Sequence, residues 1–202
     1  ALEISALIYK KNIGDEVIMP SYTFTSTASA FLKAGFKIKF VEIDPLTAMI
    51  DINAVKKSIT KKTKVIVAVH YGSFAAELKD LKKLCVKHKI KLVEDAAQSF
   101  GSFINNKAVG TYGDIGCYSF HETKNIHAGL SGAITFKNKK DYLRASNIRE
   151  RGTNRSEVIN GIKSKYTWVE TGGSYYPNEI TAAFLYPQIR NVKKNISSRK
   201  II

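Results

Sequence analysis

The sequence predicts an α/β fold in which a mostly parallel sheet is flanked by helices. Short apolar runs alternate with segments whose apolar residues repeat at helical spacing, which is typical of strand–helix–strand crossovers. The run at residues 64–70 is almost continuously apolar, as expected for a strand that is buried on both faces. The 202 residues provide one domain, or one and a fraction, since a domain takes about 150 residues.

Each element in the first half of the chain has a local signal. Pro20 ends the first strand because proline has no N–H for the ladder, and Gly35 closes the first helix. In the third helix Leu78, Leu81 and Leu84 form one apolar stripe. The expected strands are residues 16–19, 37–41, 64–70 and 91–95. The expected helices are residues 23–33, 52–58 and 76–88.

The second half of the chain continues this alternation and then loses it. Two further strands are expected at residues 114–120 and 132–136, followed by a helix at residues 139–149. Beyond Arg151 the sequence is rich in Gly, Ser, Thr and Tyr and shows no clear period. A last helix at residues 179–189 is expected to be interrupted at Pro187, because proline lacks the N–H and its ring clashes with the preceding turn.

The strongly basic composition raises the question of nucleic-acid binding. Lys and Arg number 32 against 17 Asp and Glu, a net charge of +15, but only six of the basic residues are arginine. The lysines lie mostly in helical segments, where a solvated face is expected, and they are not interleaved with aromatic residues. The sequence therefore predicts no nucleic-acid partner, and an anionic small molecule fits the charge equally well.

The apolar runs and the cysteines indicate a soluble protein of a reducing compartment, and we expect it in the cytoplasm. The longest unbroken apolar stretch, residues 65–69, is far shorter than the about 20 residues that a membrane helix needs. No basic and then apolar leader opens the chain. Cys85 and Cys117 are not in a CxxC arrangement, so neither a disulfide framework nor a metal site is expected.

Chemically active side chains stand at the ends of three predicted strands. His70 and Tyr71 stand at the end of one strand, residues 94–98 at the end of a second, and residues 119–124 at the end of a third. In parallel sheets ligands bind outside the carboxyl ends of the strands. We therefore expect an acid, an amide, a histidine, a hydroxyl and a lysine to converge on one edge.

These residue types could support cofactor chemistry. A partly buried lysine such as Lys124 can act as a nucleophile or bind a carbonyl carbon, and Asp95 could hold a pyridinium nitrogen. Ser119 could bind a phosphate, and Phe24 could stack on a ring. Taken singly, a lysine is more often solvated and a strand-end Asp more often forms a cap or an ion pair. Glu94 faces the opposite side of its strand by alternation, so we give it no catalytic role.

Several long motifs resemble a known family. Residues 14–24 (GDEVIMPSYTF), 93–98 (VEDAAQ) and 116–125 (GCYSFHETKN) resemble sugar aminotransferases of the DegT/DnrJ/EryC1/StrS family. The third motif, with residues 149–156 (RERGTNRS) and 165–168 (KYTW), is most similar to the dTDP-4-amino-4,6-dideoxygalactose transaminases. The similarity runs over nearly the whole chain. It implies the large domain of a fold-type I pyridoxal-phosphate enzyme, with a mostly parallel sheet of the seven-stranded type.

The resemblance also implies roles for individual residues with pyridoxal 5'-phosphate as the cofactor. Lys124 matches the lysine that binds this cofactor covalently and moves the proton during amino transfer. Asp95 matches the acid that pairs with the pyridine nitrogen, and Gln98 matches an amide near the ring 3-hydroxyl. Ser119 matches a phosphate ligand, and Phe24 matches the aromatic residue that stacks on the ring.

Other implied roles concern the substrate and a second subunit. Such enzymes are similar in working as homodimers, and Ser174 aligns where a neighbouring subunit often sends a polar side chain to the phosphate. Many relatives have Asn there. Tyr166 could face the sugar or nucleotide, although aromatic residues more often pack in a core or a dimer interface. Arg155 could meet a diphosphate, and an exposed ion pair is the alternative.

The implied reaction moves an amino group from glutamate to a nucleotide-linked 4-keto-6-deoxy sugar, as in the synthesis of surface polysaccharides or antigens. In a related set of enzymes histidine replaces the lysine, and those enzymes dehydrate sugars. Because this position is Lys124, the resemblance favours amino transfer. The substrates would be glutamate and a nucleotide-linked keto sugar.

The chain also departs from the family pattern. Residues 1–202 are expected to form a large domain that is N-terminally incomplete, with most of the C-terminal small domain missing. Leu130, Ser131 and Ala133 replace Gly, Glu and Gly, and Ser73 stands where glycine is frequent, so strain is expected wherever φ is positive. The alternative reading is therefore a truncated or degenerate non-catalytic fragment, or a binding domain that keeps the scaffold.

Overall fold

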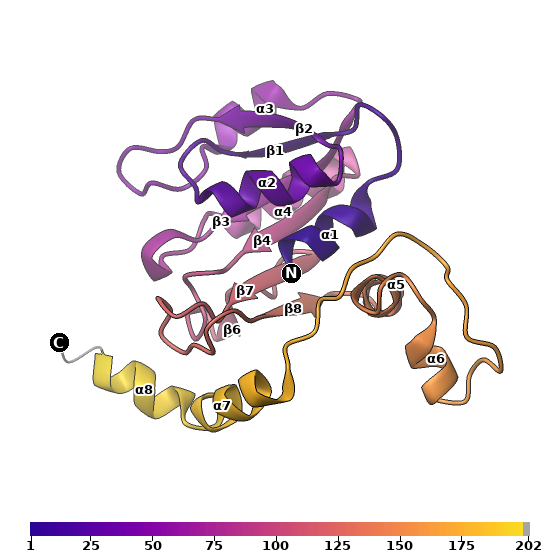
Figure 1. Ribbon diagram of the computed structural model, residues 1–202. Coiled ribbons are helices and arrows are strands. Elements are labelled where there is room, and N and C mark those ends of the chain that lie inside the picture. The colour runs from indigo at the N-terminus through magenta and orange to yellow at the C-terminus, as the bar shows by residue number, and fades with distance from the viewer. Residues whose placement is uncertain (200–202) are drawn as a thin grey trace.

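The computed structural model consists of a mixed sheet with helices on both faces (Figure 1). It describes residues 1–199, so the last three residues of the predicted domain lie outside the described part. The strand order is β2-β1-β3-β4-β7-β8, parallel except that β8 runs antiparallel to β7. The strands are β1 (Glu16–Pro20), β2 (Lys37–Val41), β3 (Thr63–Val69), β4 (Lys91–Asp95), β7 (Ile115–Ser119) and β8 (Gly132–Phe136). The predicted α/β fold with a mostly parallel sheet is confirmed.

The main sheet has six strands in the described residues, whereas the family resemblance suggests a sheet of the seven-stranded type. Between residues 1 and 199 the outer edge of β8 pairs with no other strand. Apart from isolated bridges, the remaining paired segments, β5 (Phe103–Ile104) and β6 (Lys107–Ala108), form a separate two-stranded sheet. No described strand is therefore left to pair with β8.

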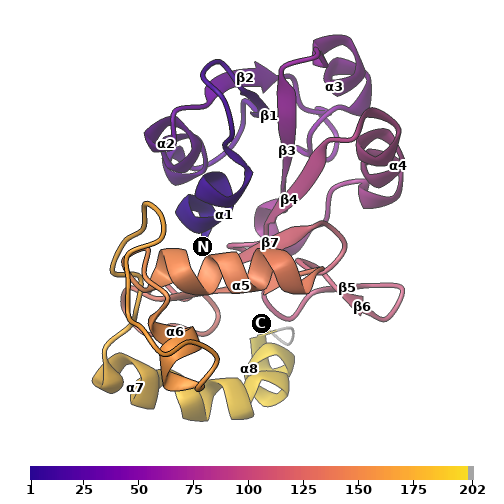
Figure 2. The same cartoon turned by 90° about the vertical axis from the view of Figure 1, so that its right-hand side faces the viewer.

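The two faces of the sheet are covered by different helices (Figure 2). Val65 and Val67 of β3 pack in one core cluster with residues of α1 (Leu2–Tyr9), α2 (Thr25–Lys33) and α5 (Lys139–Arg149). Ile66 and Ala68 alternate with them and pack in a second cluster with α3 (Ile52–Ser58) and α4 (Leu78–His88). The prediction that this strand is buried on both faces is confirmed.

Local chemistry explains where several helices begin and end. Asp51 begins α3 by accepting a hydrogen bond from the N–H of Asn53, and Asn138 begins α5 by accepting one from the N–H of Asp141. Lys89 ends α4 in the left-handed conformation, with φ of 56°. The predicted stripe of α4 is buried, which fixes this helix against the sheet.

The structure corrects the sequence prediction at several elements. The helix α7 (Glu179–Arg190) continues through Pro187. Pro187 has no N–H to donate to the carbonyl of Ala183, but Ala183 is exposed, so water can take the place of that hydrogen bond. The sequence did not predict α1, α6 (Arg155–Ile159), α8 (Val192–Arg199) or the β5–β6 hairpin. In α1 five of eight residues are buried, so this helix has no polar face that periodicity could detect.

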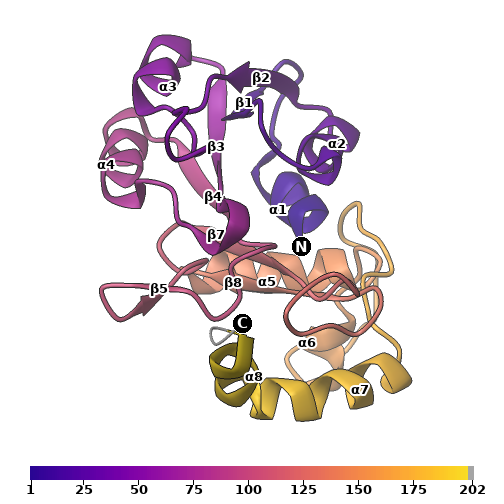
Figure 3. The same ribbon diagram turned by 90° about the vertical axis from the view of Figure 1, so that its left-hand side faces the viewer.

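Residues 151–199 are here named the C-terminal arm; its helix α6 lies next to α5, and α7 and α8 lie beyond the β8 edge of the sheet (Figure 3). Its helices α6, α7 and α8 contain no buried residue. Within residues 1–199, no helix combines the length and the apolar character that crossing a membrane requires.

Candidate active site

Three parallel strands end side by side at one edge of the sheet. Val69, the last residue of β3, pairs with Asp95, the last residue of β4, and Asp95 pairs with Cys117 of β7. The segments that follow these strands therefore leave the sheet together. The structure brings Asp95, Ser119 and Lys124 to this edge.

Two adjoining cavities lie at this edge. One, of about 330 Å³, is lined by Asp95 and by residues of α1 and α2. The other, of about 300 Å³, is lined by Gln98 and Lys124. Ala97 and Ser119 line both cavities, so the two are neighbours. Together they surround the acid, the amide, the hydroxyl and the lysine that the sequence singled out.

The carboxyl group of Asp95 is buried and holds two hydrogen bonds. Thr27 donates its hydroxyl to Oδ2 at 2.7 Å, and the N–H of Ala97 donates to Oδ1 at 3.2 Å. Burial raises the pKa of Asp95, while these two bonds and the nearby positive charge of Lys124 oppose that rise. Whether Asp95 is ionised therefore depends on its hydrogen bonds with Thr27 and Ala97 and on the charge of Lys124.

Glu94, the preceding residue, faces the other side of the sheet, as alternation predicts. Its carboxylate accepts hydrogen bonds from the N–H groups of Gly110, Tyr112 and Gly113 at 2.6–2.8 Å and contacts His70 Nε2 at 3.0 Å. Burial alone would raise the pKa of Glu94, but the hydrogen bonds from His70 and the backbone hold it below the usual value. Glu94 therefore ties the loop at residues 110–113 to the sheet edge.

His70 has a fixed ring orientation. The N–H of Ala76 points at Nδ1 at 3.1 Å, so the ring proton sits on Nε2 and is donated to Glu94. The ring is fully buried, and its backbone N–H donates to the carbonyl of Asp95 at 3.0 Å. His70 thus supports the strand end from behind and does not line either cavity.

The lysine stands on a tight turn after β7. Lys124 is half-buried, and its N–H donates to the carbonyl of His121 at 2.9 Å. Ser119 Oγ accepts a hydrogen bond from the N–H of His121 at 3.2 Å. Gln98 Oε1 accepts one from the N–H of Gly72 at 2.8 Å, so its NH₂ group is the part that can reach a ligand.

The expected backbone strain occurs at one of the positions named from the sequence. Ser73 has φ of 70°, and its hydroxyl donates to the carbonyl of Gln98 at 2.9 Å, which helps to hold this conformation. Leu130, Ser131 and Ala133 are not among the described residues with positive φ, so the condition for strain is not met there. The positive φ of this loop falls on Gly129, which tolerates it.

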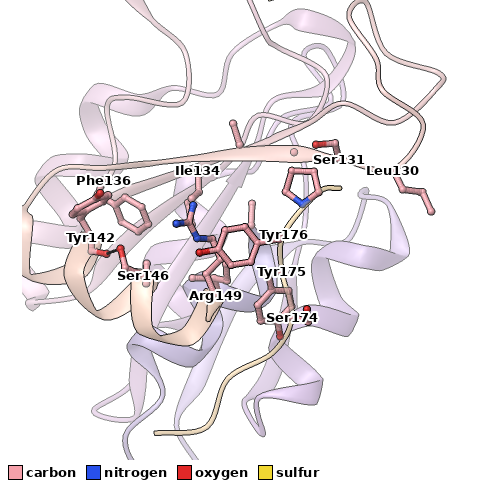
Figure 4. A pocket seen from close by; sticks show the side chains of 16 residues that line it. Leu130, Ser131, Ile134, Phe136, Tyr142, Ser146, Arg149, Ser174, Tyr175 and Tyr176 are labelled. Atoms are coloured by element: carbon pink, nitrogen blue, oxygen red, sulfur yellow. Dashed lines mark hydrogen bonds between the residues drawn. The ribbon is translucent and has the colours of Figure 1, made fainter. Parts of the chain in front are cut away.

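Neither Phe24 nor Ser174 lines the two cavities. Phe24 precedes α2 and is 71% exposed. Ser174 lines a larger cavity of about 560 Å³ along β8, where Arg149 lies 4.5 Å from the centre of the Tyr176 ring (Figure 4). Arg151 donates to Ser174 Oγ at 3.3 Å. Neither Lys124 nor Asp95 lines this larger cavity.

Tyr166 and Arg155 also lie outside the two cavities, on the C-terminal arm. Tyr166 is 56% exposed, so it does not belong to a core within this chain. Arg155 lies 3.4 Å from the carboxylate of Glu150, an ion pair that is exposed at Arg155 but buried at Glu150, whereas the sequence pointed to an exposed ion pair as the alternative.

Sequence reasoning missed Thr27 as a neighbour of the acid. A signal was present, because Thr27 is a polar residue on the face of α2 that buries Ala30 and Phe31. A hydroxyl on an apolar helix face needs a partner. Which partner it has could not be known from the sequence, because Asp95 lies 68 residues away.

The fold is that of fold-type I aminotransferases. The crystal structure of 3-amino-5-hydroxybenzoic acid synthase superposes with a TM-score of 0.90 at 29% identity, covering 98% of this chain and 51% of that one. The DegT/DnrJ/EryC1/StrS aminotransferase family matches residues 1–202. The chain therefore belongs to this family, and the resemblance inferred from its motifs is confirmed at that level.

Curated relatives include enzymes of nucleotide-sugar metabolism. GDP-perosamine synthase of Vibrio cholerae is 29% identical over 94% of this chain and 50% of its own length. UDP-N-acetyl-3-dehydro-alpha-D-glucosamine 3-aminotransferase of Acidithiobacillus ferrooxidans is 40% identical over 60% of this chain and 33% of its own length. The chain thus spans about half the length of GDP-perosamine synthase.

Proposed function

We propose that this chain forms the large domain of a pyridoxal-phosphate-dependent aminotransferase that acts in the cytoplasm. The proposed reaction transfers an amino group from glutamate to a nucleotide-linked 4-keto-6-deoxy sugar. The observation that carries the proposal is the buried Asp95 and the half-buried Lys124 on two adjoining cavities at the carboxyl edge of the sheet. Membership of the aminotransferase family supports the same activity.

The residues around the two cavities have the chemistry that pyridoxal phosphate needs. Lys124 supplies a primary amine for the aldehyde carbon, and Asp95 supplies a carboxylate for the ring nitrogen. Ser119 and Gln98 supply a hydroxyl and an amide for the phosphate and the ring oxygen. Phe24 is proposed to stack on the ring. When bound, pyridoxal phosphate supplies an electron sink that stabilises negative charge on the carbon bearing the amino group.

The protein's own contribution is to hold this chemistry in place and to move one proton. Asp95, as a buried carboxylate, would hold the proton on the ring nitrogen through charge pairing. The Nζ atom of Lys124 would take the proton from the α-carbon of glutamate and later return one to the carbon that carries the new amine. The tight turn that holds Lys124 fixes where this atom can reach.

The relatives and the charge support a nucleotide sugar as the acceptor. The two curated relatives described above are named for a GDP-linked and a UDP-linked sugar. The net charge of +15 suits an anionic diphosphate. We propose that Arg155 and Tyr166 contact this nucleotide sugar, and that a dTDP-linked 4-keto-6-deoxy sugar is the substrate, as motif similarity to the dideoxygalactose transaminases indicates.

We also propose that the enzyme works as a homodimer. The C-terminal arm exposes many large apolar side chains, among them Trp168, Ile180 and Phe184. Exposed apolar surface of this kind is typical of protein interfaces. In such a dimer Ser174 would reach the phosphate site of the partner subunit.

Reductive trapping tests the proposed cofactor site. The chain is incubated with pyridoxal phosphate, reduced with borohydride and digested, and the modified lysine is identified by mass spectrometry. A dominant adduct on Lys124 is expected, because the other side chains that would hold the cofactor surround this amine. Lys124→Ala should abolish this adduct, whereas Lys163→Ala, a change at an exposed lysine of the arm, should leave it intact.

Labelling that is spread over many surface lysines would contradict the proposal. In that case the chain would be a non-catalytic remnant or a binding domain that keeps the scaffold. A dominant Lys124 adduct would justify an amino-transfer assay with glutamate and dTDP-linked keto sugars.

A further inference from the structure

Thr27 joins helix α2 to the carboxylate of Asp95. Its hydroxyl lies 2.7 Å from Asp95 Oδ2, across 68 residues of sequence. Thr27 is 1% exposed, so this contact is shielded from water. Thr23, in the loop between β1 and α2, places its own hydroxyl 2.8 Å from that of Thr27. Two hydroxyls and one carboxylate thus form a short chain of hydrogen bonds.

The direction of this chain follows from the donors that are available. Thr27 donates its only hydroxyl proton to Asp95 Oδ2, so toward Thr23 it can only accept, and Thr23 is the donor of the second bond. Hydrogen bonds in a row strengthen one another. A helical threonine often donates to a carbonyl of the preceding turn instead. In this helix the hydroxyl is directed to the acid.

The charged groups around Asp95 give this bond a consequence. Burial favours the neutral acid and raises the pKa of Asp95. The groups that oppose burial are the hydroxyl of Thr27, the N–H of Ala97 and the positive charge of Lys124. The thiol of Cys117 also faces Asp95, but burial raises its pKa to about 12, so it adds no charge at neutral pH. A neutral Asp95 could not pair with a protonated ring nitrogen.

We propose that Thr27, supported by Thr23, is a positioning residue that holds Asp95 ionised and oriented for the ring nitrogen of the cofactor. This inference rests on the proposed function, because it assigns Asp95 to that nitrogen. Thr27 acts only through Asp95. Its role can therefore be measured on the carboxyl group itself, before any cofactor is added.

The first experiment titrates Asp95 in the chain without cofactor. Aspartate labelled with ¹³C at the carboxyl carbon reports each carboxyl group by NMR, and Asp95→Asn assigns the resonance. Thr27→Val keeps the shape but removes the donor, so the titration midpoint should rise by about one pH unit. Thr27→Ser should restore the midpoint, and Thr25→Val, a change at an exposed threonine of the same helix, should not move it.

The second experiment measures the affinity for pyridoxal phosphate by absorbance titration at pH 8. When the titration is repeated at lower pH, the affinity of Thr27→Val should fall at a pH about one unit higher than that of the wild-type chain, because Asp95 must be ionised to pair with the ring nitrogen. Thr27→Ser should bind like the wild-type chain. If the wild-type chain does not take up pyridoxal phosphate, the proposed function fails, while the NMR titration still decides whether Thr27 sets the charge of Asp95.

Two outcomes would overturn the inference. One is an unchanged Asp95 midpoint in a Thr27→Val variant that circular dichroism shows to be folded. The other is a Thr27→Ser variant as impaired as Thr27→Val, since packing and not the hydroxyl would then matter. If Thr27→Val does not fold, Thr23→Val takes its place: the midpoint should shift in the same direction by a smaller amount, and no shift counts against the inference.

Discussion

Residues 1–150 and the C-terminal arm differ in how much apolar surface they bury. In the first region, here named the sheet region, β3 is buried along almost its whole length and Phe31 of α2 is fully buried. In the arm, α7 has no buried residue, and Ile180 is 83% exposed. The sheet region therefore has a core of its own, and the arm depends on contacts with other surfaces.

The candidate site residues divide along the same line. Asp95, Ser119 and Lys124 belong to the sheet region, whereas Arg155 and Tyr166 belong to the arm. A packed core fixes the position of the side chains that stand on it, while exposed apolar residues are typical of interfaces. The comparison supports the proposal that the cofactor chemistry belongs to the sheet region and that the arm takes part in assembly.

The largest expected difference concerns two phenylalanines. Phe31→Ala should lower the free energy of unfolding by about 3–5 kcal/mol, because it empties a space in the core. Phe184→Ala, at a side chain of α7 that is 54% exposed, should change it by no more than about 0.5 kcal/mol. Urea denaturation followed by circular dichroism measures both, at a concentration where the chain is monomeric. Equal losses would show that the arm contributes to a core and would break the comparison.

A smaller difference should appear in the pH dependence of stability. The folded pKa of Glu94 is lowered from 4.5, so its stabilising effect is fully present above the unfolded pKa and is lost as pH falls through the folded pKa. Glu94→Gln should lower the free energy of unfolding by about 1.5–3 kcal/mol at pH 7. It should also flatten the acid limb of the stability curve, which is the fall in the free energy of unfolding as pH is lowered. The measurement is the free energy of unfolding in urea between pH 7 and pH 3.

The control for this prediction is Glu179→Gln at the exposed start of α7. It should cost less than about 1 kcal/mol and should leave the acid limb unchanged. A Glu94→Gln variant with the full acid limb of the wild-type chain would show that other carboxylates cause it.

The smallest expected effect lies where the two regions meet. His127 stands three residues after Lys124. Gln188 of α7 accepts a hydrogen bond from the N–H of His127 at 3.2 Å and donates one to the His127 carbonyl at 2.7 Å. Gln188→Ala should cost about 1 kcal/mol and should speed amide hydrogen exchange at residues 121–128. Gln188→Glu, which keeps the acceptor but loses the donor, should give an intermediate rate. Unchanged exchange would mean that the arm does not restrain the lysine turn.

Much of the sheet region was predictable because its signals are local. The strands β2, β4 and β8 and the helices α3 and α5 begin and end at the predicted residues. Alternating apolar residues, turn residues and caps such as Asp51 lie within a few positions of the elements they define. In the arm, α6 and α8 contain no buried residue, and their sequences show no apolar stripe from which these helices could be predicted.

The sequence by itself determined the class of fold, the family and the edge of the sheet where the acid and the lysine meet. The family followed from the resemblance of its motifs, and the edge could be predicted because parallel strands joined by helices bring their carboxyl ends to one side. Only the tertiary structure decided that Thr27 donates to Asp95, that Glu94 ties down the loop at residues 110–113, and that Tyr166 lies outside the two cavities. The reason is that such contacts join side chains distant in the chain, and their directions depend on packing that local patterns do not encode.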